Sequence, residues 1–227
     1  LLPHGKQTGD LRPLNQPVSA ETILASQTRP YQPGDPLRRF HRPTSARRGI
    51  PYIKILDPEA ASRIWLVPDM DPNVHYGKGN DSSEETLVLL LAALSTHLLG
   101  EHREVGLYSA ADTPQIVMPQ RGPAHLWTML AALTPLHTNQ TTPFQTVLAQ
   151  ASGLISSRDL VIVVTPSLDL QWMQTLSLIT RGHGKSESWA FILDPLSFGG
   201  QQRAESVLVP AAGMGITARV VHQGEIK

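Results

Sequence analysis

Five consecutive aliphatic residues, Leu160 to Val164, constrain the fold of this chain more than any other sequence feature. A strand with one solvent-facing side alternates apolar and polar residues, whereas this run contains no polar position. Such a run indicates a strand that is buried on both faces. Buried strands of this kind are typical of parallel sheets that helices cover on both sides. The sequence therefore predicts an α/β domain built around this strand.

Segments with strand and helix patterns alternate along the rest of the chain, which predicts a doubly wound, mostly parallel sheet of about six strands with helices on both faces. The expected strands are residues 52–56 (an edge strand), 64–67, 105–108 and 115–118 (a hairpin), 160–164, 189–193 and 216–221. The expected helices are residues 84–99, 124–133, 143–155, 168–181 and a short one at 203–208. Thr142 is the expected N-cap of the third helix and Pro143 its first residue.

The first 49 residues differ in composition from the remainder. They are rich in proline, glycine and polar residues and follow neither a strand nor a helix period. Such a segment cannot form a core of its own, so it is expected to dock on the domain. The sequence thus divides into an irregular segment, residues 1–49, and an α/β domain, residues 50–227.

Composition excludes several kinds of chemistry. The chain has no cysteine, which rules out thiolate zinc sites, disulfides and cysteine nucleophiles. Its 19 basic and 19 acidic residues balance, so no overall field favours nucleic acid as a partner. Nucleophile-elbow, phosphate-loop and dinucleotide glycine patterns are absent, and the nine histidines show no ligand spacing. The apolar run at 87–99 is too short to span a bilayer, and the first residues do not resemble a signal peptide.

Asp69, Asp71 and Asn73 follow the expected strand 64–67 and are the strongest candidates for a site. Ligands of doubly wound folds bind beyond the carboxyl ends of strands. Alternate spacing lets side-chain oxygens converge on one hard cation. The same residue types also form turns and caps, which is the structural alternative.

Two functional interpretations compete for this cluster. In a metal-ion-dependent adhesion site, a metal ion is held by an Asp-x-Ser-x-Ser motif, a threonine and a further aspartate. A carboxylate of the partner protein completes the coordination of the metal. In a haloacid-dehalogenase-like phosphohydrolase, Asp69 and Asp71 would be nucleophile and general acid beside magnesium, with Thr165 and Lys185 as auxiliary groups. The chain lacks the acidic cluster that such an enzyme needs after the next strand, where Asp194 stands alone.

A second block of sequence adds a resemblance to a known family. Arg-x-Tyr-x-Pro-Gly-Asp, then an arginine, an apolar residue and Ser-Ala-Arg, is similar to a block of the bacterial DUF58 family, a domain of unknown function with a von Willebrand factor A-like fold. The matching residues are Arg29, Tyr31, Pro33, Gly34, Asp35, Arg38, Phe40, Ser45, Ala46 and Arg47. Arg42 departs from the family, which has tryptophan there. We expect these charged and turn-forming residues to dock the segment on the α/β domain.

The resemblance implies a metal-ion-dependent adhesion site that has been partly lost. Asp69 matches its first aspartate, whereas Asp71 and Asn73 replace its two serines. Thr142 matches its threonine, and Thr165 is followed by proline where the family has its last aspartate. Asp69 and Asp71 are the expected metal ligands of such a site. Together with waters they are compatible only with weak binding of Mg²⁺ or Ca²⁺.

The function implied by the resemblance is non-catalytic protein–protein recognition. The expected surface consists of the loops 69–73, 138–143 and 165–169, with Asp69, Asp71, Asn73, Thr142 and Thr165 as its polar residues. The family also implies a bacterial protein anchored to the membrane by segments outside this chain, with this domain in the cytoplasm. Its implied partner is a MoxR-type AAA+ ATPase. The magnesium-dependent phosphohydrolase remains the alternative.

Overall fold

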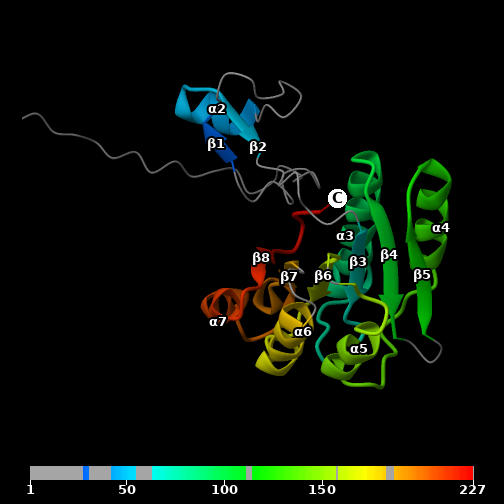
Figure 1. Cartoon of the computed structure of the whole chain (residues 1–227). Helices are drawn as coiled ribbons and strands as arrows, with labels where there is room; N and C mark the ends of the chain where they lie inside the picture. Colours follow the sequence, from blue (N-terminus) through cyan, green and yellow to red (C-terminus); the bar gives the residue numbers. More distant parts are fainter. Residues whose placement is uncertain are drawn as a thin grey trace, which may run out of the picture.

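A computed structural model describes residues 28–30, 42–54, 63–110, 114–156, 158–182 and 187–226. Its main feature is a six-stranded sheet in the order β5-β4-β3-β6-β7-β8. All neighbouring strands are parallel except β4 and β5, which form the expected antiparallel hairpin. The strands are β3 (Arg63–Pro68), β4 (Glu104–Ser109), β5 (Gln115–Gln120), β6 (Leu160–Thr165), β7 (Glu187–Leu193) and β8 (Thr217–Val221). The predicted α/β fold is confirmed (Figure 1).

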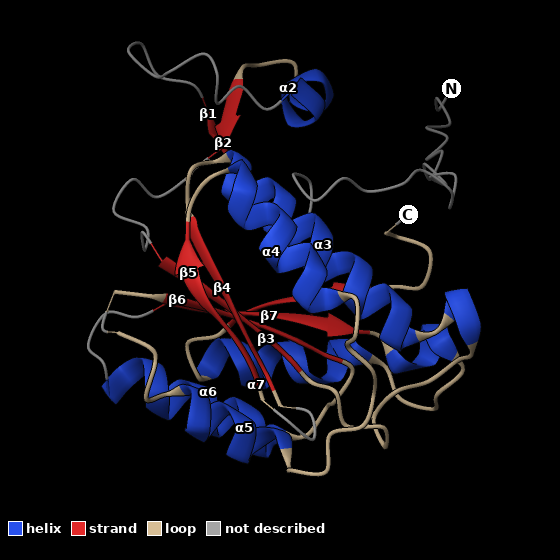
Figure 2. Cartoon of the chain, turned by 90° about the vertical axis from the view of Figure 1, so that its right-hand side faces the viewer, coloured by secondary structure: helices blue, strands red, loops and turns tan. Residues whose placement is uncertain are grey.

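Helices cover both faces of this sheet (Figure 2). One face carries α3 (Ser83–Gly100) and α4 (Pro123–Leu133), and the other carries α5 (Phe144–Ala151), α6 (Leu170–Gly182) and α7 (Leu208–Gly213). In the part of the chain that the structure describes, three short 3₁₀ segments connect these elements: η2 (Gly79–Asp81), η3 (Pro195–Phe198) and η4 (Ala204–Val207). The expected helix at 203–208 corresponds to η4, and α7 continues directly from it.

Strand alternation divides the core into two layers. On β3, Ile64 and Leu66 pack in the layer under α3 and α4, whereas Trp65 and Val67 pack in the opposite layer. All four side chains are at most 2% exposed. Because successive side chains point to opposite faces, a strand covered on both sides must be apolar at every position. The uninterrupted apolar runs of β3 and β6 follow from this requirement.

A buried carboxylate joins the amino ends of the two central strands. Asp159 precedes β6, and its Oδ2 accepts hydrogen bonds from Arg63 Nη2 at 2.8 Å and from Trp65 Nε1 at 3.2 Å. The Ser156 amide donates to the same oxygen at 2.9 Å. Since Asp159 is only 3% exposed, these donors offset the cost of burying its charge.

The start of α5 differs from the sequence prediction. The helix begins at Phe144, and Pro143 is its N-cap residue with φ −55° and ψ 139°. Thr142, the expected N-cap, therefore lies one position before the cap. The extended ψ of Pro143 keeps that residue outside the helix, while its carbonyl accepts from the Thr146 and Val147 amides. The side chain of Pro143 offers no capping group, and no side-chain cap bond is formed.

The strand predicted at 52–56 is not an edge strand of the main sheet. β2 (Tyr52–Lys54) pairs antiparallel with β1 (Thr28–Pro30) in a separate two-stranded sheet. The partner strand lies in the segment that the sequence described as irregular, which also contains α2 (Arg42–Arg48). A main-chain ladder to an upstream strand carries no periodic sequence signal, which is why this pairing was missed.

Ser45 of the family block holds this small unit together. Its hydroxyl accepts from the Tyr52 amide at 2.7 Å and donates to the Tyr52 carbonyl at 3.4 Å. The Arg48 guanidinium also lies over the Tyr52 ring, 5.5 Å from its centroid. Arg47 is exposed on α2. Arg29 lies in β1 and Ala46 is exposed on α2. The remaining block residues lie outside the described residues, so docking of the segment and its boundary at residue 49 remain predictions; they are Tyr31, Pro33, Gly34, Asp35, Arg38 and Phe40.

A glycine in β4 permits the close approach of β5. A Cβ atom added at Gly106 would lie 2.8 Å from the Val117 carbonyl oxygen and 2.8 Å from Pro119 Cγ. We therefore expect Gly106→Ala to lower the free energy of unfolding by about 1–3 kcal/mol, because β5 must shift. Gly100→Ala, whose added Cβ meets nothing within 4 Å in α3, is the control and should be neutral or stabilising. Urea unfolding measures both, and equal effects would contradict the packing argument.

Candidate functional site

The site lies where the carboxyl ends of β3 and β6 adjoin. Pro68 pairs with Val164 in the parallel register, so the next residues, Asp69 and Thr165, lie beside each other. The Asp69 amide extends the ladder by donating to the Val164 carbonyl at 2.9 Å. The Thr165 hydroxyl donates to Asp69 Oδ2 at 2.7 Å. Residues that are 96 positions apart in the sequence thus form one polar contact at this edge of the sheet.

Asp69 is enclosed by protein. Its exposed fraction is 0%, and its second oxygen, Oδ1, accepts from the Asp71 amide at 3.2 Å. Burial raises the pKa of Asp69 to about 7. The hydrogen bonds from Thr165 and from the Asp71 amide lower this pKa, and the negative charge of Asp71 raises it further. At neutral pH, the carboxyl group is therefore close to half protonated, unlike an exposed aspartate.

Asp71 and Asn73 form a local turn rather than an open ligand set. Asp71 Oδ1 accepts from the Asn73 amide at 2.9 Å and from Asn73 Nδ2 at 2.8 Å. The Val74 amide then donates to the Asp71 carbonyl at 3.2 Å. An aspartate that binds the backbone two residues ahead is a turn-forming arrangement. The observed contacts of Asp71 and Asn73 are therefore those of a turn, which is the structural alternative to a set of metal ligands.

His75 is a site residue that the sequence did not indicate. Its Nε2 lies 2.8 Å from the Asp69 carbonyl oxygen, and its Nδ1 lies 3.0 Å from Ser83 Oγ. Because the carbonyl can only accept, Nε2 must carry the proton, and Nδ1 accepts from the Ser83 hydroxyl. Burial lowers the pKa of His75, which favours this neutral tautomer. His75 thereby joins the end of β3 to the first turn of α3.

Gln140, rather than Thr142, links the loop 138–143 to the end of β3. Its side-chain Oε1 accepts from the main-chain amide of Met70 at 3.2 Å, and its main-chain amide donates to the Met70 carbonyl at 3.1 Å. Gln140 Nε2 also donates to the Thr142 carbonyl at 2.8 Å, so Thr142 takes part in this link through its main chain. Only 3% of Gln140 is exposed. Sequence reasoning missed this residue because nothing distinguishes a glutamine that binds backbone groups from a surface glutamine.

These contacts do not fit a firmly held metal ion. Mg²⁺ and Ca²⁺ require six or more oxygen ligands, whereas both oxygens of Asp69 and one of Asp71 are already bound within the protein. Pro143 and Pro166, which follow Thr142 and Thr165, offer no side-chain ligand. Within the described ranges, no three His, Asp or Glu side chains gather in a metal-holding group. Weak binding of Mg²⁺ or Ca²⁺ remains a prediction.

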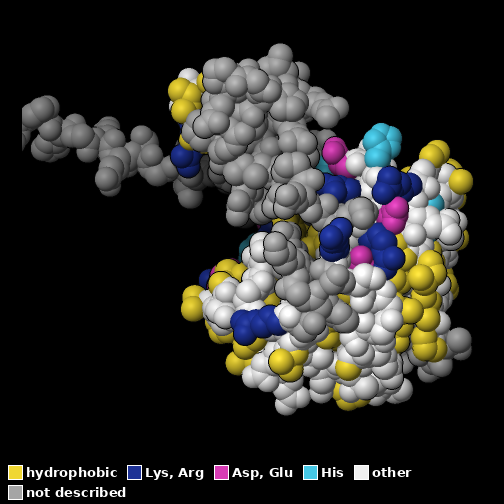
Figure 3. Space-filling model, in the orientation of Figure 1, with side chains coloured by type: hydrophobic (Ala, Val, Ile, Leu, Met, Phe, Trp, Pro, Cys, Tyr) yellow, Lys and Arg dark blue, Asp and Glu magenta, His cyan; other side chains and the backbone are white. Residues whose placement is uncertain are grey.

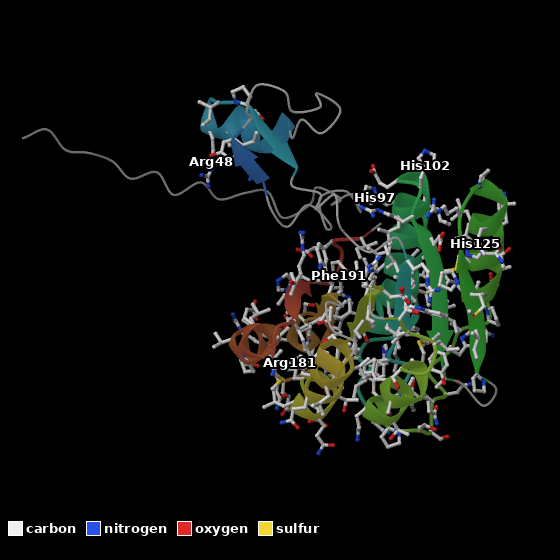
Figure 4. All side chains as sticks on the ribbon, in the orientation of Figure 1. Arg48, His97, His102, His125, Arg181 and Phe191 are labelled. Carbon is white, nitrogen blue, oxygen red and sulfur yellow. The ribbon has the colours of Figure 1, made fainter. Side chains whose placement is uncertain are left out.

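Three further histidines lie on or directly after the helices α3 and α4. His97 lies on α3, His102 follows that helix, and His125 lies on α4 (Figure 4). His125 is buried, and its Nε2 lies 2.7 Å from the Val105 carbonyl oxygen. His102 adopts a φ of 60° in the turn that leads into β4. The ring of His125 is thus bound to the main chain of β4 rather than directed at the carboxyl ends of the central strands.

The fold and this edge define an α/β domain with a polar, internally hydrogen-bonded site at the carboxyl ends of its central strands. A family described as "Protein of unknown function DUF58" matches residues 27–185, which is more than half of the chain. The chain belongs to this family. Uncharacterized proteins of Mycobacterium tuberculosis and Mycobacterium bovis are 27% identical to it over 111 residues. The match covers 48% of this chain and 35% of those proteins, so it spans about a third of their length.

Two solved structures share the fold at low sequence identity. The conserved hypothetical protein BatB from Bacteroides thetaiotaomicron has a TM-score of 0.50 and 12% identity, covering 71% of this chain and 90% of its own. The pilus adhesin SpaC from Lactobacillus rhamnosus GG has a TM-score of 0.55 and 11% identity, covering 74% and 29%. At such identities, the likeness concerns the fold alone. Among the described residues, no helix has the length and apolar character needed to cross a bilayer.

The buried carboxyl group makes stability depend on pH. Since the pKa of Asp69 rises from 3.8 to about 7 on folding, the folded state holds a proton that the unfolded state releases. Its contribution to stability is present below pH 4 and is lost as pH rises through 7. Relative to the wild type, Asp69→Asn should therefore gain about 2–3 kcal/mol between pH 5 and pH 8. Urea unfolding at both values tests this, with exposed Asp81→Asn as control; parallel profiles would contradict it.

The hydroxyl of Thr165 should be important for stability. Thr165→Val keeps the side-chain shape but removes the donor to Asp69 and the acceptor of the Ser167 amide, which lies 2.8 Å away. We expect a loss of about 1–3 kcal/mol in the free energy of unfolding, because buried polar groups are left without partners. Thr165→Ser retains the hydroxyl and is the matched control. A valine variant as stable as the serine variant would show that the contact is dispensable.

Proposed function

We propose that this chain is a non-catalytic protein-recognition domain of von Willebrand factor A type, whose recognition surface is the carboxyl edge of the sheet. The surface consists of the loops 69–73, 138–143 and 165–169. One observation carries the proposal: the carboxylate that a metal-dependent adhesion site would direct at its ion is buried against Thr165 instead. Recognition then rests on the shape and the hydrogen-bonding groups of the loops, with metal optional.

The arrangement of these loops supports a preformed surface. Gln140 ties the loop 138–143 to the main chain of Met70, and Thr165 ties the loop 165–169 to Asp69. Their anchoring residues are buried, whereas Pro72, Asn73 and Thr141 are exposed at the edge. A rigid scaffold that presents exposed loop residues is a common basis of protein recognition, because little conformational freedom is lost on binding.

The phosphohydrolase alternative has less support. A nucleophilic carboxylate must reach its substrate, but Asp69 is 0% exposed and both of its oxygens accept hydrogen bonds. The general-acid position, Asp71, is engaged in the turn with Asn73. Lys185, the candidate charge partner, lies outside the described residues.

The proposed partner is a MoxR-type AAA+ ATPase, and the proposed setting is a bacterial protein held at the membrane by segments outside this chain. Both follow from the resemblance of the family block, of which the structure describes Arg29, Ser45, Ala46 and Arg47. An ATPase partner requires this domain to be on the cytoplasmic side of the membrane, where ATP is available. The carboxyl edge would then be the surface that meets the ATPase.

Metal titration tests the degenerate site. Calorimetric titration with Mg²⁺, Ca²⁺ and Mn²⁺ should give dissociation constants weaker than about 1 mM, because too few free oxygen ligands remain. Asp69→Ala should leave these weak signals unchanged. Micromolar binding that Asp69→Ala abolishes would overturn the metal-optional surface, since it would show an intact metal site.

Binding of the ATPase tests the surface itself. We expect purified MoxR-type ATPase to be retained by the immobilised chain in the presence of a chelator. The Asp71→Ala/Asn73→Ala variant should weaken this binding at least tenfold, because it removes the polar side chains of the turn at the edge. Glu101→Ala/Gln174→Ala, at exposed positions on other elements, is the matched control. Equal binding by the two variants would place the contact elsewhere, and phosphatase turnover lost in Asp69→Asn would favour the enzyme.

A further inference from the structure

The connection between α4 and α5 contributes the loop 138–143 to the proposed recognition surface. Two of its side chains are buried anchors. Leu136 is 4% exposed in the core layer under α3 and α4, and Gln140 is 3% exposed and binds the main chain of Met70. The three residues 137–139 connect these anchors, so their conformation decides how the first part of the loop is presented.

Glu84, in the first turn of α3, holds this short segment with both oxygens of its carboxylate. Its Oε1 accepts from the Thr138 amide at 3.2 Å, and its Oε2 accepts from the Thr138 hydroxyl at 2.9 Å. Oε1 also lies 3.4 Å from Nδ1 of His137. A carboxylate that binds two donors of one residue fixes the orientation of that residue as well as its distance.

The Glu84 contacts complete a closed ring of hydrogen bonds at this edge. The ring leaves the end of β3 through a histidine, enters the first turn of α3, crosses to the connection between α4 and α5, and returns to the end of β3. In this order, its members are His75, Ser83, Glu84, Thr138, Gln140 and Met70. The loops 69–73 and 138–143 are therefore fixed relative to each other, and Glu84 is the member that joins α3 to the second loop.

Recognition at this edge depends on groups whose hydrogen bonds are directional. Asn139 and Thr141, which are uncharged and exposed, flank the buried Gln140. Figure 3, in the orientation of Figure 1, shows few charged side chains at the lower end of the molecule, where the carboxyl ends of the parallel strands lie. Hydrogen bonds weaken steeply when donor and acceptor are misaligned. A partner that binds these groups therefore requires the loop in one conformation.

We infer that Glu84 is a positioning residue of the recognition surface: it does not meet the partner, but holds the loop 138–143 in the conformation that the partner binds. The inference rests on the proposed function of this edge. Without the Glu84 carboxylate, residues 137–139 are free to leave this conformation while Leu136 and Gln140 stay buried. The apparent dissociation constant then rises by the inverse of the fraction of molecules that keep the binding conformation.

Amide hydrogen exchange tests the positioning role without a partner. Glu84→Ala should raise the exchange rates of the Thr138 and Asn139 amides about tenfold, because the segment opens locally, and should leave the amides of β6 as slow as in the wild type. Glu85→Ala is the matched control, since it removes the same charge from the same turn of α3 at an exposed position. Equal exchange of the two loop amides in both variants would overturn the inference.

Binding kinetics with the purified MoxR-type ATPase test the effect on recognition. Glu84→Ala should lower the association rate about tenfold and leave the dissociation rate unchanged, because fewer molecules hold the binding conformation but the bound state is the same. Glu84→Gln keeps an oxygen acceptor for the Thr138 amide and should recover most of the association rate. Glu85→Ala should bind like the wild type.

The outcomes separate this inference from the proposed function. If the wild type binds the ATPase and Glu84→Ala associates equally fast, the inference alone is wrong. An effect confined to the dissociation rate would show that Glu84 contacts the partner directly, which also overturns a positioning role. Absence of binding by the wild type would overturn the proposed function and this inference together, whatever the exchange rates.

Discussion

The hydrogen bond between Thr165 and Asp69 connects the fold to the site, because it closes the carboxyl ends of the two central strands. At their amino ends, Asp159 performs the matching task by accepting from Arg63 and Trp65. The central pair is thus fixed at both ends by a buried carboxyl group. The two ends differ chemically, since Asp159 has a cationic partner, whereas the donors to Asp69 among the described residues are neutral. An acid without a cation in a buried position favours its protonated form, which explains the raised pKa of Asp69.

Most of the fold could be predicted from the sequence because both sheet faces are covered. Continuous apolar runs such as Leu160 to Val164 are typical of that arrangement, and α3 follows from its long apolar stretch. The errors have a different origin. The pairing of β2 with β1 depends on main-chain bonds, which leave no residue pattern. The helix α5 begins one residue later than predicted. Pro143 has an extended ψ and serves as the N-cap residue rather than as the first helical residue.

The site was predictable in position but not in chemistry. The sequence assigned the loops that contain Asp69 and Thr165 to one surface, since parallel strands bring their carboxyl ends to one edge. Which oxygens remain available for a ligand depends on contacts that are remote in sequence, such as those of Gln140 with Met70 and His75 with Ser83. Those contacts convert a ligand-rich sequence into a closed hydrogen-bonded structure.

The place of β6 in the sheet has a further consequence for how the protein is made. β3 adjoins β4, which follows it closely, and β6, which follows about 90 residues later. During synthesis, β3 can pair with β4 first. The other hydrogen-bonding edge of β3 therefore stays unpaired until β6 leaves the ribosome. Contacts of such long sequence separation form slowly and leave strand edges open to wrong partners. Until β6 has been synthesised, the nascent chain therefore carries an unpaired strand edge that another chain could occupy.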